Sequence, residues 1–315
     1  MHLCRKISPR LNSTDNFAAC IDHYIFNSVI DASLSQNFLP ARRPTDNFAA
    51  CIDLNDLFSM IINSEGIVLR QRKIANNRRM IVLFTKRYGK LSAGTSINEK
   101  SKSRSALALR PFTYAEYDIF KGRETYSINS SQVLKSFYSI GEDIDRFIMA
   151  SSFIEYLDKV LAEGEPMPHL FDLSLEFLES VSHAGKSAET LLLAYIYKTL
   201  KMLGVAPELT CCVNCGKKPS EFGGNSGIRS FSVTSGGIIC DECEKEEKTN
   251  PNALIYKPSF DIITVFVYFD SKPLKTFEKI DLKPEVLTEV RTILAEYIDR
   301  YLGTDVLRQS IGPEV

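Results

Sequence analysis

The stretch Cys212-Val-Asn-Cys215-Gly216 is followed, after residues 217–239, by Cys240-Asp-Glu-Cys243. Each CxxC pair brings two sulfur atoms close together, and two such pairs facing each other across a loop form a tetrahedral thiolate site. Gly216 and Gly236-Gly237 let the backbone fold over a metal at this place. Four cysteines leave no coordination position for water, so we expect one structural zinc ion. The predicted ligands are Cys212, Cys215, Cys240 and Cys243.

Cys211 offers a second donor beside Cys212, but it would make a CxxxC spacing with Cys215, which closes a knuckle less well. We therefore predict Cys212 as the ligand. Two disulfides or four free thiols are the alternative. The amino terminus lacks the apolar run of a signal peptide. The cysteines are therefore expected in the reducing cytoplasm, where a metal is favoured over disulfides.

The composition is that of a soluble protein with two or three domains. The chain has 315 residues, of which 44% are hydrophobic and 24% are charged. Its apolar stretches are too short to span a bilayer; residues 262–269, for example, are interrupted by Thr264. We expect no membrane partner.

The net charge of −1 conceals an asymmetry along the chain. Residues 60–140 contain 15 Lys and Arg against 5 Asp and Glu, whereas residues 141–315 contain 18 against 28. A basic module joined to an acidic one indicates a polyanionic partner for the first module only.

Residues 1–59 differ from the rest of the chain. The nine residues Thr14–Asp22 recur letter for letter as Thr45–Asp53, a period of 31 residues. One repetition is too few for a solenoid, and no helical or strand period persists around it. A binding repeat is one interpretation. We favour a non-native or disordered extension, with Met60 as the natural beginning.

From Met60 to residue 138 the pattern is that of short strands separated by turns. The strand-like runs are 67–69, 80–84, 90–93, 111–120 and 125–128. Five short strands without a helical period predict a small closed barrel of the OB-fold type.

Cations and aromatic residues are interleaved along this predicted barrel. Phosphate neutralisation needs many cations on one surface, and binding of single strands adds aromatic platforms for bases. A merely solvated face with core aromatics is the alternative. The aromatic residues are Phe84, Tyr88, Phe112, Tyr114 and Tyr117. The candidate DNA-binding residues are Arg70, Arg72, Lys73, Arg78, Arg79, Lys86, Arg87, Tyr88, Lys90, Lys100, Lys102, Arg104 and Arg110, the last four cations in a Ser-rich loop.

Beyond Ser130 the sequence turns helical, and we assign residues 139–315 to an α-helical domain with the zinc finger inserted at 211–247. Apolar residues recur at three- and four-residue steps from Ile144 to Leu161. Further helices are expected at 170–181, 188–203, 258–269 and 284–302. Pro284 suits a first helical turn and Gly303 a left-handed cap. The fold class is therefore α+β and multidomain.

Enzymatic motifs are missing. The glycines of residues 223–227 lack the lysine and the preceding strand of a phosphate loop, and no GxSxG motif occurs. No histidine has a serine or carboxylate at a suggestive spacing. We predict a protein that is not an enzyme.

Several segments together resemble the RecO family of bacterial recombination mediators. In the barrel region they are Glu65-Gly-Ile-Val-Leu69, Tyr88-Gly-Lys-Leu91, Lys100-Ser-Lys-Ser-Arg104 and Leu109-Arg-Pro-Phe112. In the cysteine region they are Leu203-Gly-Val-Ala-Pro-Glu-Leu209, Cys212-Val-Asn-Cys215-Gly216, Phe231 and Gly236-Gly-Ile-Ile-Cys-Asp-Glu-Cys243. The resemblance runs from about Met60 to Leu307 and leaves residues 1–59 uncovered.

The resemblance implies an OB-fold, a helical domain and an inserted Cys4 finger. It also implies a non-enzymatic mediator that binds single- and double-stranded DNA and anneals complementary strands. With RecR, and in some settings RecF, such proteins help RecA replace the single-strand-binding protein SSB. Two other hypotheses stay open: a zinc-ribbon accessory factor acting on RNA or transcription, and a DNA-processing enzyme. The acidic character of residues 241–247 disfavours the first.

Overall fold

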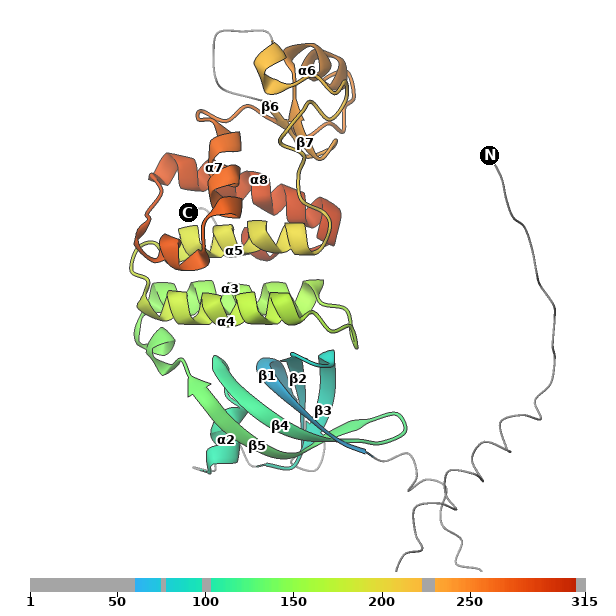
Figure 1. The fold of residues 1–315 in the computed structure, drawn as a ribbon, viewed down its shortest axis with the longest axis vertical. Coiled ribbons are helices and arrows are strands. Elements are labelled where there is room, and N and C mark those ends of the chain that lie inside the picture. Colours follow the sequence, from blue (N-terminus) through green and yellow to red (C-terminus); the bar gives the residue numbers. More distant parts are fainter. Residues whose placement is uncertain (1–59, 75–77, 98–102, 223–229, 310–315) are drawn as a thin grey trace, which may run out of the picture. The chain divides into compact units, whose positions relative to one another are not determined.

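The computed structural model describes residues 60–74, 78–97, 103–222 and 230–309. The predicted extension, residues 1–59, lies outside the described residues, as does the turn at 75–77. Within the described part, five strands and one short helix come first, and a mainly helical part that contains three short strands follows (Figure 1).

Five strands form a closed barrel in the order β1-β2-β3-β5-β4. β3 pairs with β5 in parallel, and the other neighbouring strands are antiparallel. The strands are β1 (Met60–Lys73), β2 (Arg79–Thr85), β3 (Gly89–Thr95), β4 (Thr113–Lys121) and β5 (Tyr126–Ser136). The predicted OB-fold barrel is confirmed.

Alternation of side chains explains how the barrel closes. In β3 and β4 every second residue is buried, and small residues such as Ala93 and Ala115 face inward beside Tyr117. A bulge between Val68 and Arg70 bends the long strand β1, so that its first half pairs with β4 and its second half with β2.

Two predictions for the barrel region were wrong. The chain does not turn helical after Ser130, because β5 continues to Ser136 in pairing with the first half of β4. The Ser-rich loop contains a short helix, α2 (Arg104–Ala108), which begins where the Ser103 side chain accepts the backbone N–H of Ala106. Five helical residues are too few to show a period in the sequence.

The remaining elements form a helical part with a small β element inserted in it. The helices are η2 (Tyr138–Glu142), α3 (Ile144–Val160), α4 (Pro168–His183), α5 (Ala188–Met202), α7 (Ile262–Ser271), η4 (Leu274–Lys279), α8 (Pro284–Leu302) and α9 (Val306–Gln309). The inserted element comprises η3 (Pro219–Glu221), β6 (Ser230–Ser232), β7 (Gly237–Ile239), α6 (Asp241–Glu247) and β8 (Ile255–Tyr256).

Helix ends follow local signals. Helix α7 begins at Ile262 rather than near Pro258, because the Asp261 side chain accepts the backbone N–H of Ile263. Helix α8 has Pro284 in its first turn and ends at Gly303 with φ +64°, both as predicted.

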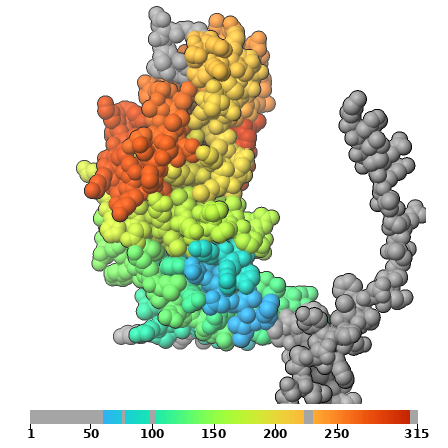
Figure 2. Space-filling view, in the orientation of Figure 1, coloured from blue at the N-terminus to red at the C-terminus, as the bar shows by residue number. Residues whose placement is uncertain are grey.

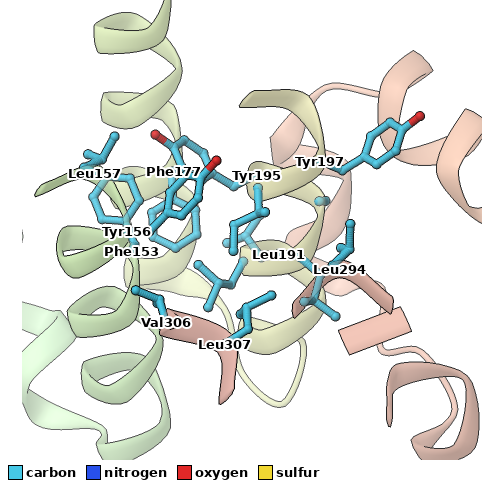
Figure 3. Packing of buried hydrophobic residues seen from close by; sticks show 14 of the residues in the cluster. Phe153, Tyr156, Leu157, Phe177, Leu191, Tyr195, Tyr197, Leu294, Val306 and Leu307 are labelled. Atoms are coloured by element: carbon cyan, nitrogen blue, oxygen red, sulfur yellow. The ribbon is translucent and has the colours of Figure 1, made fainter. Parts of the chain in front are cut away.

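Helix α5 lies at the centre of the helical core, between α3 and α4 on one side and α7 and α8 on the other (Figure 1). Figure 3 shows Phe153 of α3 and Phe177 of α4 meeting Tyr195 of α5. The rings of Phe153 and Phe177 stack with centroids 4.4 Å apart, and the Tyr195 hydroxyl lies 2.9 Å from that of Ser174. The buried ring therefore keeps a hydrogen-bond partner.

The barrel packs on α3 and α4, and the two parts share one apolar core. The Phe84 ring of β2 meets the Phe171 ring of α4 edge to face at 5.3 Å. The backbone N–H of Gly164, in the loop after α3, donates to the Lys90 carbonyl at 2.8 Å. On the face shown in Figure 2, atoms of the barrel adjoin those of the following helices.

Replacing Gly89 by Ala is expected to lower the free energy of unfolding by about 2–4 kcal/mol. Gly89 has φ +66°, and an added Cβ would lie 2.1 Å from the carbonyl oxygen of Glu165 in the α3–α4 loop. Equilibrium urea unfolding measures the change. Gly185→Ala is the matched control, because an added Cβ there meets nothing within 4 Å. Equal effects of the two substitutions would contradict the described packing.

Candidate metal centre and nucleic-acid surface

Four cysteine sulfurs gather in the inserted element. The Sγ atoms of Cys212, Cys215, Cys240 and Cys243 all lie within 4.8 Å of one another. Two come from the loop after α5, and two from the end of β7 and the start of α6. The set contains Cys212 and not Cys211, which is the choice that the CxxC spacing favours.

The spacing of these sulfurs fits a metal better than a disulfide. A tetrahedral ion with Zn–S bonds of about 2.3 Å requires neighbouring sulfurs about 3.8 Å apart. The Sγ atoms of Cys215 and Cys240 are 3.7 Å apart, and all four residues are free thiols. A disulfide would require about 2.05 Å between sulfurs. The four cysteines can therefore hold a metal ion.

The surrounding backbone holds the cysteines in place. Gly216, with φ +76°, closes the first knuckle by donating its N–H to the Cys212 carbonyl at 2.9 Å. The N–H of Cys240 points at the Cys212 sulfur at 3.4 Å. Gly237 is required because a Cβ there would lie 2.3 Å from the carbonyl oxygen of Glu208.

The surroundings of the cluster shift the pKa values of Cys212 and Cys243 in opposite directions. Burial raises the pKa of Cys212, but backbone N–H groups of Cys240, Cys215 and Asn214 outweigh it and hold that pKa at about 7. Burial and the neighbouring thiols raise the pKa of Cys243. A bound cation would relieve the repulsion among the four sulfurs when all are thiolates.

Five of the predicted cations are exposed and form no ion pair with a described carboxylate. Arg72 and Arg78 lie on either side of the turn between β1 and β2, and Arg87 lies in the turn between β2 and β3. Arg104 is the first residue of α2, and Arg110 follows that helix. Lys73 is also exposed. The five are Arg72, Arg78, Arg87, Arg104 and Arg110.

Three other predicted cations contact the helical part, although the side chains of Arg70 and Lys86 remain partly exposed. Arg70 Nε lies 3.2 Å from Asp158 of α3, and Lys90 donates to the Asp158 carbonyl at 2.6 Å. Lys86 pairs with Asp172 of α4 at 2.8 Å, and a hydrogen bond to that carboxylate raises the pKa of the lysine. These contacts hold the barrel on the helices, which the charge pattern alone did not reveal.

Arg79 is buried, with 5% of its surface exposed, rather than on the outer face as the charge pattern suggested. Its guanidinium donates to the Gln71 amide oxygen and to the Ile97 carbonyl, each at 2.9 Å. Lys100 and Lys102 lie outside the described residues.

Most of the interleaved aromatic residues belong to the core. Phe84, Phe112 and Tyr117 are buried, and the Tyr117 hydroxyl donates to the Ala108 carbonyl of α2 at 2.6 Å. Tyr114 is half-buried; burial and its hydrogen bond to Glu65 raise its pKa. Of the five, only Tyr88 is partly exposed, has cationic neighbours and makes no ring contact with another described residue. It is therefore the one residue of this set that remains a candidate platform for a base.

The sequence patterns did not identify a cavity of about 680 Å³ between α2, β5, η2 and the start of α3. Arg104 and Arg110 line it together with Tyr138 and Phe147. Phe147 belongs to the apolar recurrence from Ile144 that predicted this helix, yet it is 45% exposed. The sequence signal that could have indicated this cavity is the pair of large aromatic residues, Tyr138 and Phe147, that follow the basic loop in the chain.

Among the described residues, the cysteine set is the one group of three or more His, Cys, Asp or Glu side chains placed to hold a metal. None of the helices that these residues form combines the length and the apolar run needed to cross a membrane.

Two family models match the chain. The model described as Recombination protein O N terminal matches residues 60–137, and the one described as Recombination protein O C terminal matches residues 141–310. The first corresponds to the barrel and the second to the helical part with its insert.

Curated relatives carry the same description. A protein named DNA repair protein RecO from Alkaliphilus metalliredigens is 31% identical over 241 residues, which cover 76% of this chain and 93% of the relative. Proteins of the same name from Bacillus pumilus and Caldanaerobacter subterraneus are 31% and 30% identical. Both alignments cover 78% of this chain, with 90% and 94% of the respective relatives.

Proposed function

The chain belongs to the RecO family of DNA repair proteins, and we propose that it acts as a non-enzymatic recombination mediator. In this function it binds single- and double-stranded DNA and anneals complementary strands. With RecR, and in a functional link to RecF, it helps RecA assemble on DNA covered by SSB. Its place of action is the cytoplasm, on the nucleoid.

The observation that carries this proposal is the uneven charge of the two halves. Residues 60–140 have a balance of +10, and residues 141–315 have a balance of −10. Five arginines of the first half are exposed without a described carboxylate partner. Cations free of such partners are available to neutralise phosphates.

An annealing protein must neutralise two phosphate backbones without reading their bases. Distributed cations provide this, since phosphate contacts position a strand and carry no sequence information. The exposed arginines lie on separate turns, at β1–β2, β2–β3 and around α2, rather than in one pocket. This arrangement supports annealing over sequence-specific recognition.

We propose a corresponding division of labour along the chain. Residues 60–138 form the DNA-binding domain, and residues 139–315 form a helical domain that DNA repels and that holds the partner proteins RecR and SSB. The finger at 211–247 binds one zinc ion through Cys212, Cys215, Cys240 and Cys243. Because four thiolates complete its shell, the zinc stabilises the fold and takes no part in chemistry.

The alternative of an RNA-binding zinc ribbon would place nucleic acid on the finger itself. The finger surface disfavours this. Its helix α6 carries Asp241, Glu242, Glu246 and Glu247, and Lys217 is paired with Glu242. An anionic ligand would meet like charge there.

Adding this protein to complementary strands coated by SSB should accelerate duplex formation. Adding RecR as well should promote RecA assembly on the same substrate. The physical reason is cationic neutralisation of both backbones at once. Fluorescence energy transfer between end-labelled strands measures the annealing, and gel analysis of the same mixture detects cleavage. Strand cleavage, or unaltered annealing at low salt, would contradict a non-enzymatic mediator.

A further inference from the structure

The cavity between α2, β5, η2 and α3 combines a ligand-sized volume, positive charge and aromatic rings. The proposed function assigns no role to it. Its volume of about 680 Å³ lies within the range of about 300–1,000 Å³ that is usual for ligand sites. Its lining includes arginines, amide side chains and aromatic rings, and it lies on the barrel side of α3.

The cavity is cationic. Arg79 lines it and is buried, yet both of its described acceptors are neutral, the Gln71 amide oxygen and the Ile97 carbonyl. Arg104 and Arg110 add two exposed guanidinium groups, and the described residues of the lining include no Asp or Glu. A buried charge without a carboxylate partner is costly unless an anion approaches it.

A second hollow on the barrel lacks this property. The hollow beside Tyr88 is lined by Lys86 and Arg87, but also by Glu65 and Glu116, so its charges balance. Lys86 is further neutralised by Asp172. The described lining of the first cavity therefore carries an excess of positive charge that the described lining of the second lacks.

Aromatic rings line the same cavity. Tyr138 of η2 is 76% exposed, and the Phe147 ring of α3 meets that of Phe112 edge to face at 5.8 Å. Phe112 has φ +57°, a conformation that a bulky residue adopts only where its surroundings enforce it. The N–H of Phe137 donates to the Phe112 carbonyl at 3.0 Å and helps to hold this wall.

We propose that this cavity holds one unpaired nucleotide of single-stranded DNA. Its phosphate lies against Arg104 and Arg110, with Arg79 behind them, and its base stacks on Tyr138 and Phe147. Gln71 and Gln132, which also line the cavity, offer amide groups to the base edge. The inference rests on the proposed function and adds the site at which single strands are distinguished from duplexes.

Discrimination follows from the need for an unpaired base. A base in a duplex is stacked and paired, so it could enter only after extrusion, which costs a few kcal/mol. Stacking on an aromatic ring is tolerant of sequence because every base has a π-face. The site therefore prefers single strands without selecting among sequences, as an annealing protein requires.

The test compares Tyr138→Ala with Tyr268→Ala, a partly exposed tyrosine on α7 outside the cavity. Fluorescence anisotropy with a short oligothymidylate should show affinity about 5- to 100-fold weaker for Tyr138→Ala, with duplex affinity unchanged. Tyr268→Ala should change neither. Because the Tyr138 side chain is mostly exposed, its loss should leave the fold intact, which circular dichroism checks.

A second readout locates the contact directly. An oligothymidylate carrying one 5-iodouracil should photocrosslink to Tyr138 or Phe147 in the full chain, as identified by mass spectrometry. Crosslinks confined to other residues, or equal weakening of single strands and duplex by Tyr138→Ala, would overturn the proposal. An Asp-rich peptide that binds in a Tyr138-dependent manner without displacing the oligonucleotide would also overturn it.

These outcomes separate the cavity from the proposed function. Weakening of both DNA forms by Arg72→Glu with Arg87→Glu, but no effect of Tyr138→Ala, would remove the nucleotide site and leave the DNA surface standing. Absence of any effect from the arginine substitutions would instead contradict the proposed function itself.

Discussion

Replacing Cys240 by Ser should abolish zinc binding and leave the inserted element unfolded. Four thiolates complete the shell, so three cannot provide the same site, and structural zinc in finger peptides contributes about 10–16 kcal/mol of apparent binding free energy at neutral pH. Cys240 connects β7 to α6, and its own N–H points at the Cys212 sulfur. Serine at this position keeps the backbone N–H but loses the sulfur, so the substitution removes a metal ligand and leaves the backbone contact available.

Elemental analysis of purified protein measures the effect. We expect one zinc per chain in the parent protein and none in Cys240→Ser, together with a lower melting temperature. Cys211→Ser is the matched control, because Cys211 lies next to the cluster but outside it. Zinc retained in Cys240→Ser and lost in Cys211→Ser would overturn the ligand assignment.

Removal of zinc with a chelator should lower the stability of the parent protein, as Cys240→Ser does. Cys215 is exposed whereas the other three ligands are buried, so competition for the metal is expected to begin on the side of Cys215. Zinc removal should reduce stability but leave the barrel strands formed, since residues 60–136 close among themselves. Acid should also release the metal, because protons compete for the thiolates.

The barrel and the cluster of four cysteines could be predicted from the sequence because both depend on local spacing. Alternation of buried and exposed residues in β3 and β4 has a period of two, and CxxC sets the distance between sulfurs. The end of β5 was missed, because its last residues are mostly exposed and only the partner strand defines them as strand.

Local spacing does not predict whether an individual cation is exposed, buried or paired with a carboxylate. Arg70 and Lys90 meet Asp158, and Lys86 meets Asp172, across large separations in sequence. Arg79 of β2 is buried, and its guanidinium donates to the Ile97 carbonyl. A charge count treats all these cations as one surface. In the folded protein some of them contact the helices, one is buried, and the remaining arginines are exposed.

The same division explains why the cavity was missed. Its walls come from α2, β5, η2 and α3, four segments of which two were predicted incorrectly as loop or helix. Phe147 recurs at helical spacing with core residues, so its position in sequence indicates burial. In the folded protein the ring is partly exposed and lines the same cavity as Arg110.

Charge reversal at the exposed arginines is the second large effect that we expect. Arg72→Glu, Arg78→Glu and Arg87→Glu together should weaken binding to single strands and duplex alike, on the order of 100-fold at about 50 mM salt. Arg79 is left out because its replacement would disturb the barrel. The matched control is Lys275→Glu, Lys279→Glu and Lys283→Glu, three exposed lysines at η4 and the start of α8.

The dependence of DNA affinity on salt concentration tests the basic barrel most directly. Each lost phosphate contact should reduce the slope of log affinity against log salt by roughly 0.7 for single strands and roughly 0.9 for duplex. The arginine triple variant should therefore lose about 2 from the slope for single strands, and the lysine triple variant should retain the parent slope. Equal losses in the two variants, or a loss confined to the lysine variant, would contradict the assignment of DNA binding to the barrel.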